Sequence, residues 1–205
     1  MRRTKKVLIL LVVAATTLSA ACVKTSPIRL GHNDQFNELH VVAVDLSLDV
    51  TGEIDTGEYR ADLARKFDYL LPKLNSAHPL ETLYIKEITT SIDYKQSSTP
   101  ARVIRAIISF IPFLSPIPDR HRFTHNIEYA LADSQGREVF RSNIVATLKM
   151  NSSGWTFFRP HFASKVRAMA PRRSAYLVAT DIARDIVRHQ RYIEDATRRS
   201  KPAES

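Results

Sequence analysis

The feature that most constrains this chain is its only cysteine, Cys22, together with the segment that precedes it. Four basic side chains stand within residues 1–6, an unbroken apolar run covers residues 7–13, and small residues dominate 14–21. This order is typical of a secretory signal peptide, and the apolar run is too short to span a bilayer. We therefore expect residues 1–21 to be removed on export, which leaves 184 of the 205 residues to fold.

Residues 18–22, with the sequence LSAAC, resemble a bacterial lipobox whose large aliphatic residue stands one place further upstream than in the commonest form. The resemblance implies that the chain is cut before Cys22 and that this cysteine is acylated, palmitate included. Family usage reads an aspartate after the cysteine as inner-membrane retention, and Val23 stands there instead. The resemblance therefore implies an anchor in the outer membrane, with the folded part facing the periplasm.

Charge and cysteine content limit what the exported chain can do. The net charge of +9 includes the four signal-peptide cations, so the rest carries +5, a modest preference for anionic lipid or phosphate groups. Acylation of Cys22 would leave no thiol for a disulfide, a nucleophile or a metal site. We expect a tether over residues 22–36, a single domain over 37–197 and a disordered tail over 198–205, with no nucleic-acid partner.

The hydrophobic pattern predicts an α+β fold. Strands are expected over 39–50, 81–94, 123–131 and 140–148, and helices over 55–74 and 174–196. In the first strand the expected inner face is Val42, Val44, Leu46, Leu48 and Val50. The order βαβββα predicts a four-stranded, mainly antiparallel sheet with two helices on one face, plus a short amphipathic helical insert. This order resembles that of small periplasmic auxiliary lipoproteins of lipid-transport systems, without a motif that carries functional residues over.

Two apolar segments, residues 98–118 and 155–162, do not fit this scaffold. Acidic residues are absent from 95–118 and from 142–179, so both segments are apolar and purely cationic. If the last three strands are antiparallel, both segments leave from one end of the sheet. Such a composition is typical of an interfacial membrane contact. The candidate contact residues are Arg102, Ile104, Arg105, Ile107, Ile108, Ile111, Phe113, Trp155, Phe157, Phe158 and Arg159.

The same segments have other interpretations. Their apolar side chains could pack as ordinary core, since large exposed apolar patches are uncommon. They could also line a cavity, which would make the protein a carrier of a lipid or another apolar ligand. If they are exposed, the partners are membrane lipid, beside the acylated Cys22, or an envelope protein complex.

The sequence contains no catalytic motif, so we expect a protein that is not an enzyme, with no catalytic residue, cofactor or metal. His121 and His125 have the spacing of a helical metal pair. They fall on an expected strand, where residues four apart are about 13 Å apart, so structural or surface histidines are expected. In the last helix, a solvated and salt-bridged face is expected for Asp181, Arg184, Asp185, Arg188, Arg191, Glu194 and Asp195.

Overall fold

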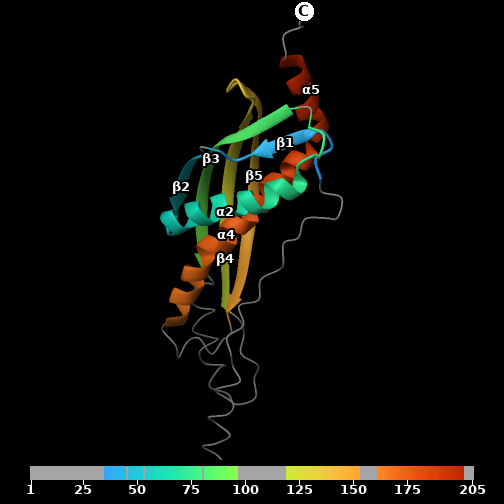
Figure 1. Ribbon diagram of the computed structural model, residues 1–205. Coiled ribbons are helices and arrows are strands. Elements are labelled where there is room, and N and C mark those ends of the chain that lie inside the picture. Colours follow the sequence, from blue (N-terminus) through green and yellow to red (C-terminus); the bar gives the residue numbers. More distant parts are fainter. Residues whose placement is uncertain are drawn as a thin grey trace, which may run out of the picture. The chain divides into compact units, whose positions relative to one another are not determined.

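The computed structural model describes residues 35–44, 46–52, 54–79, 81–96, 119–152 and 161–200 (Figure 1). The chain divides into two compact units. The main unit combines Ser26–Lys95, Arg122–Lys149 and Arg167–Ser205, and the second unit combines Met1–Thr25, Gln96–His121 and Met150–Val166. Most of the described helices and strands belong to the main unit.

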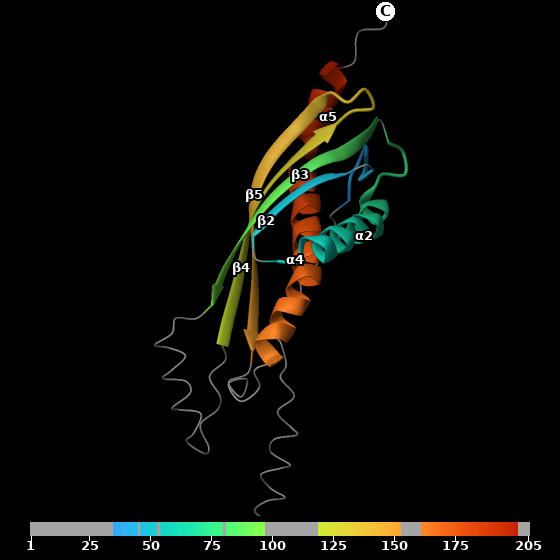
Figure 2. The same ribbon diagram turned by 90° about the vertical axis from the view of Figure 1, so that its left-hand side faces the viewer.

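The elements confirm the predicted α+β class. Their order along the chain is β1 (Leu39–Val42), β2 (Ser47–Gly52), α2 (Thr56–Leu74), β3 (Glu81–Gln96), β4 (Asp119–Ala132), β5 (Glu138–Ser152), α4 (His161–Arg188) and α5 (Gln190–Ser200). They form a five-stranded sheet in the order β1-β3-β4-β5, with β2 also paired to β3. Figure 2 shows β3, β4 and β5 alternating in direction, with α2 and α4 together on one face of the sheet, as predicted. The short helix expected within 98–118 lies outside the described residues.

The expected first strand is two strands, and this corrects the prediction of a continuous strand over 39–50. Both β1 and β2 pair parallel with β3, but Leu39 is opposite Glu81 whereas Ser47 is opposite Glu87, so the register shifts between them. Leu39 and Val41 are buried, while Val44 is 54% exposed. The predicted inner face was therefore wrong for β1, because the interruption after Val42 changes which residues face the core.

The same change of phase occurs on β3, where a bulge near Glu87 is expected from the sequence. Leu83 and Ile85 are buried, Lys86 and Glu87 are both exposed, and burial then resumes at Ile88. Two successive exposed residues shift the buried set from odd to even positions, because side chains alternate across a strand. The phase change on β3 thus lies beside the gap that separates β1 from β2.

Local side-chain hydrogen bonds fix both ends of α2. The carboxylate of Asp55 accepts from the backbone N–H groups of Gly57 and Glu58, at 3.0 and 3.1 Å, which confirms the predicted helix start. At the other end Asn75 both accepts from the N–H and donates to the C=O of Val41, at 2.8 and 3.0 Å. The Asn75 amide therefore forms the two backbone hydrogen bonds at Val41 that a neighbouring strand would otherwise form. It also ties the end of α2 to the sheet.

Apolar residues recur at helical spacing in both predicted helices, and these residues are buried. On α2 these are Tyr59, Leu63, Phe67, Leu70 and Leu74, and on α4 and α5 they are Val178, Ile182, Ile186 and Ile193. The sheet contributes further buried residues, which include Leu83, Ile88, Phe123, Ile127 and Leu131. A helix with one apolar stripe gains most of its stability by burying that stripe, and here the sheet face supplies the partner surface.

Gly52 ends β2 in a conformation that other residues adopt at a cost. Its φ is +130°, and a Cβ at this position would lie 2.4 Å from the carbonyl oxygen of Ile92, its partner on β3. We expect Gly52→Ala to lower the free energy of unfolding by about 2 kcal/mol, because both the backbone conformation and the contact with Ile92 are unfavourable. Urea unfolding followed by circular dichroism measures this loss.

Gly57 provides the matched control for that substitution. It lies in the first turn of α2, and a Cβ there would meet nothing closer than the Asp55 carboxylate at 3.5 Å. Gly57→Ala should therefore leave stability unchanged or raise it by less than about 1 kcal/mol. Equal stability of the two variants would show that the approach of β2 to Ile92 is not as close as described.

Candidate functional site

The residues that the sequence singles out lie outside the part of the chain that the structure describes. These are Cys22, Arg102, Ile104, Arg105, Ile107, Ile108, Ile111, Phe113, Trp155, Phe157, Phe158 and Arg159. The strands that lead to them are described. Where they pass out of the main unit, β3, β4 and β5 lie at the same end of the sheet (Figure 2). The chain thus continues into both apolar segments from neighbouring strands.

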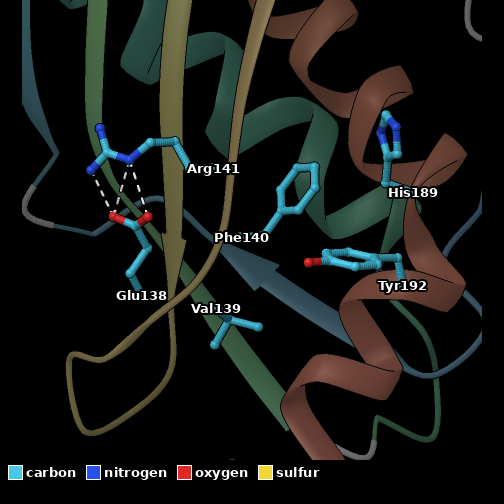
Figure 3. A pocket seen from close by; sticks show the side chains of 6 residues that line it. All are labelled: Glu138, Val139, Phe140, Arg141, His189 and Tyr192. Carbon is cyan, nitrogen blue, oxygen red and sulfur yellow. Dashed lines mark hydrogen bonds and ion pairs between the residues drawn. The ribbon is translucent and has the colours of Figure 1, made fainter.

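The main unit also has an open hollow of about 480 Å³ where β5 meets the junction of α4 and α5 (Figure 3). Its lining is Glu138, Val139, Phe140, Arg141, His189 and Tyr192. The Phe140 ring lies 5.4 Å from the His189 ring and 6.1 Å from that of Tyr192, centroid to centroid. Tyr192 is 64% exposed, so the hollow has an aromatic wall that is open to solvent.

The other rim of the hollow is a set of ion pairs that crosses three strands. The Arg141 guanidinium lies 2.6 Å from Glu138, 2.7 Å from Glu128 on β4 and 3.9 Å from Glu87 on β3. Figure 3 shows the Arg141–Glu138 pair pointing away from the aromatic wall. The Arg141 hydrogen bond also lowers the pKa of Glu138. Arg141 is therefore already matched by carboxylates and has little charge left for an anionic ligand.

A buried carboxylate lies next to this wall. Asp185 on α4 is 6% exposed, and one of its oxygens accepts hydrogen bonds from the Tyr129 hydroxyl at 2.8 Å and the Ser142 hydroxyl at 2.6 Å. Its other oxygen lies 3.3 Å from Nδ1 of His189. Burial, and then the negative charge of Asp185, raise the pKa of Tyr129, so this hydroxyl stays protonated and continues to donate.

This arrangement corrects the sequence prediction for Asp185, which was expected on a solvated, salt-bridged face. Asp181 and Arg184 do form such a pair, at 3.4 Å. Asp185 instead lies one residue before the buried Ile186, at the margin of the apolar stripe, where it can reach Tyr129. Its position at the margin of the stripe is the sequence feature that could have indicated burial. A carboxylate there can be buried only if hydrogen-bond donors lie within its reach.

The helix expected over 174–196 is divided in the structure into α4 and α5, on either side of His189. Its backbone N–H donates to the carbonyl of Asp185 at 3.0 Å, and its side-chain Nδ1 lies 3.0 Å from the same oxygen. The apolar spacing from Ile186 to Ile193 is that of an unbroken helix, so periodicity alone could not reveal the break.

The chemistry of the Asp185 cluster is structural. Ser142 and His189 both contact the carboxylate, and neither is described in contact with the other, whereas nucleophilic catalysis requires the base beside the hydroxyl. The carboxylate holds α4 to β4 through Tyr129 and to β5 through Ser142. The cluster therefore ties α4 to two strands beside the wall of the hollow.

The two histidines considered as a metal pair face the core. His121 and His125 are both buried, and neither ring nitrogen of His125 has a hydrogen-bond partner. The ring of His125 stacks on Tyr59 at 6.3 Å, and burial lowers the pKa of His125 to about 4. Among the described residues, no group of three or more His, Cys, Asp or Glu side chains could hold a metal ion. In the same part of the chain, no helix is both long and apolar enough to cross a membrane.

Comparison with known proteins finds distant similarity to solved structures. No family model and no curated protein matches this sequence. Among solved structures, a homolog of neuraminyllactose-binding hemagglutinin from Helicobacter pylori is 11% identical with a TM-score of 0.45, covering 84% of this chain and 96% of the other. A lipoprotein from Caulobacter crescentus is 12% identical with a TM-score of 0.37, covering 74% and 91%. A minor lipoprotein from Acinetobacter baumannii is 10% identical with a TM-score of 0.29, covering 80% and 97%.

Proposed function

We propose that this protein is a non-enzymatic lipoprotein of the bacterial envelope. The chain is exported, cut before Cys22 and held in the outer membrane by the acylated cysteine, with its folded part in the periplasm. The observation that carries the proposal is the N-terminal segment, where a basic start, an apolar run and small residues end at the only cysteine. No other thiol competes with Cys22 for modification.

The proposed role of the folded part is contact with membrane lipid or an envelope protein complex through residues 98–118 and 155–162. Two observations support this role. The segments are rich in apolar residues and contain cations but no acid. The three strands that lead into and out of them meet at one end of the sheet, which lets a single contact surface use both. Apolar side chains combined with cations suit the boundary between headgroups and acyl chains.

The anchor is tested by the substitution Cys22→Ala in the full chain expressed in a Gram-negative host. We expect the wild type to sediment with membranes and to give an N-terminal peptide that begins at an acylated Cys22. The variant should lose the acyl mass and leave the membrane fraction, because a lipid anchor contributes about 0.8 kcal/mol per buried methylene. A wild-type chain without fatty acyl groups on Cys22 would remove the proposal.

The contact is tested in the same Cys22→Ala background by residual binding to vesicles. We expect the added pair Ile108→Asp and Phe158→Asp to weaken that binding at least tenfold, since each buried apolar side chain contributes about 1.5–3 kcal/mol. Val145→Asp, at an exposed position on β5, is the control and should bind like its parent. Equal binding by all three chains would exclude residues 98–118 and 155–162 as the contact.

A further inference from the structure

The main unit has a cationic, tyrosine-bearing patch on its helical layer, where Lys66, Tyr69 and Lys73 of α2 lie near Tyr176 of α4. Met169 extends the patch along α4, because it stands seven residues before Tyr176 and therefore on the same helix face. The Lys73 ammonium lies 3.5 Å from the centroid of the Tyr69 ring. The Lys66 ammonium lies 6.0 Å from the Tyr69 ring and 5.1 Å from the Tyr176 ring, so it connects the two helices. We call this set of five residues the α2–α4 patch.

The patch is open to solvent. Tyr69 is 57% exposed and Met169 is 38% exposed, which is unusual for large apolar side chains of this unit. On α2 the spacing of Lys66, Tyr69 and Lys73 places them on one face, because residues three and four apart are neighbours along a helix. The exposed Asp68 is offset by about 100° from Tyr69 around the same helix.

The cations of the patch are not neutralised by carboxylates. Within the described ranges, neither Lys66 nor Lys73 forms an ion pair with Asp or Glu. Such pairs are formed instead by arginines, namely Arg65, Arg137, Arg141, Arg184 and Arg198. The two ammonium groups lie against tyrosine ring faces, which do not cancel their positive charge, so both can still attract an anionic partner. The neighbouring Lys73 ammonium lowers the pKa of Tyr69.

We propose that the α2–α4 patch docks on the surface of an anionic phospholipid bilayer. This inference rests on the proposed lipoprotein function and names the face of the main unit that meets the membrane. Tyrosine is suited to the headgroup region, because its ring is apolar and its hydroxyl is polar. Lysine can keep its ammonium among phosphates while its stem covers apolar surface. Each such cation near an anionic surface contributes about 1 kcal/mol.

The position of the patch in the chain agrees with this role. Met169 stands two residues after Arg167, where the chain enters the main unit after the cationic segment 155–162. Along the chain, the patch thus follows directly after a cationic segment that is also suited to an anionic surface.

A single fluorescent label can test the proposal, because the only native cysteine is the one that we propose to be acylated. The full acylated chain carrying Met169→Cys is labelled with an environment-sensitive dye and reconstituted on phosphatidylcholine vesicles, with or without phosphatidylglycerol. We expect the dye to become shielded only where phosphatidylglycerol is present. Lys66→Gln with Lys73→Gln should lower the ratio of docked to undocked label about 30-fold, the equivalent of two cations.

Two further chains serve as controls. A label at Val145→Cys, on the outer face of the sheet, should stay in water on both kinds of vesicle. Lys66→Arg with Lys73→Arg keeps the charge and should keep the docking, which separates a loss of charge from a loss of fold. Raising the salt concentration should release the wild-type label, because exposed charges are screened.

The outcomes that overturn the proposal are distinct. If the chain floats with vesicles but the label at position 169 is equally exposed on both lipids, the patch is not a lipid surface and the lipoprotein function stands. If the chain does not float, both proposals fall together. If soluble polyglutamate shields the label and no vesicle does, the patch binds acidic protein and the bilayer is the wrong partner.

Discussion

Replacing Asp185 by alanine should lower the free energy of unfolding by about 3 kcal/mol. The carboxylate accepts from the hydroxyls of Tyr129 and Ser142, and Tyr129 is almost completely buried. Hydrogen bonds to a charged acceptor are each worth about 1.5–3 kcal/mol, and a buried hydroxyl left without a partner adds its desolvation cost. Chemical denaturation at neutral pH, followed by circular dichroism, measures the difference.

The control is Asp181→Ala, one helical turn earlier on α4. Asp181 is half-buried and its partner Arg184 lies 3.4 Å away near the surface, so its loss should cost less than about 1 kcal/mol. Both substitutions introduce alanine into the same helix, and any gain in helix propensity is therefore shared. Similar losses for the two variants would contradict the role assigned to Asp185.

A double-mutant cycle makes the assignment more specific. Tyr129→Phe removes the hydroxyl but keeps the ring, and in the Asp185→Ala background it no longer leaves a buried donor unpaired. We expect the combined loss to be smaller than the sum of the single losses by about 1–2 kcal/mol, because the two groups share one hydrogen bond. Strict additivity would mean that Tyr129 and Asp185 do not depend on one another.

The sequence predicts those parts of the fold whose signals are local. The carboxylate of Asp133 accepts from the N–H groups of Gln135 and Arg137, both at 2.9 Å, and Gly136 has a φ of +82°. Both features belong to the turn between the predicted strands 123–131 and 140–148, and they follow from residue types within five positions of one another. The same holds for the cap at Asp55 and for the apolar stripe of α2.

The features that the sequence does not reveal depend on partners distant along the chain. The split between β1 and β2 shows only in pairing with β3, about forty residues later. The burial of Asp185 requires the hydroxyls of Tyr129 and Ser142, from two other strands. The α2–α4 patch requires Lys66 to meet Tyr176, which no periodicity within either helix can show. The contact residues in 98–118 and 155–162 remain a prediction, because the described residues do not include them.

A buried histidine should make the protein sensitive to acid. His125 lies in the core against Tyr59, and neither of its ring nitrogens has a hydrogen-bond partner. The hydroxyls of Tyr59 and Thr90 are also buried without a hydrogen-bond partner, and no carboxylate is described in contact with the imidazole. Protonation would therefore place an uncompensated charge in the core, which is why burial lowers the pKa of His125 to about 4.

The direction of the pH effect is set by that pKa. In the unfolded chain a histidine has a pKa of about 6.5. Between that pH and about 4, the unfolded state therefore binds a proton at His125 and the folded state does not. The stabilising effect of a neutral His125 is present above about pH 6.5 and is lost as the pH falls to about 4, which amounts to roughly 3 kcal/mol. Denaturation at a series of pH values should show this loss in the wild type. In His125→Phe, which keeps the ring against Tyr59, the loss should be smaller by that amount.

An exposed histidine supplies the control for this pH series. Replacing His78 by glutamine removes an exposed imidazole and leaves the buried His125 in place, so the wild-type pH dependence should be retained. If His125→Phe instead loses stability with acid as steeply as the wild type, the imidazole of His125 must have access to water or to a carboxylate. The packing described around Tyr59 would then be wrong.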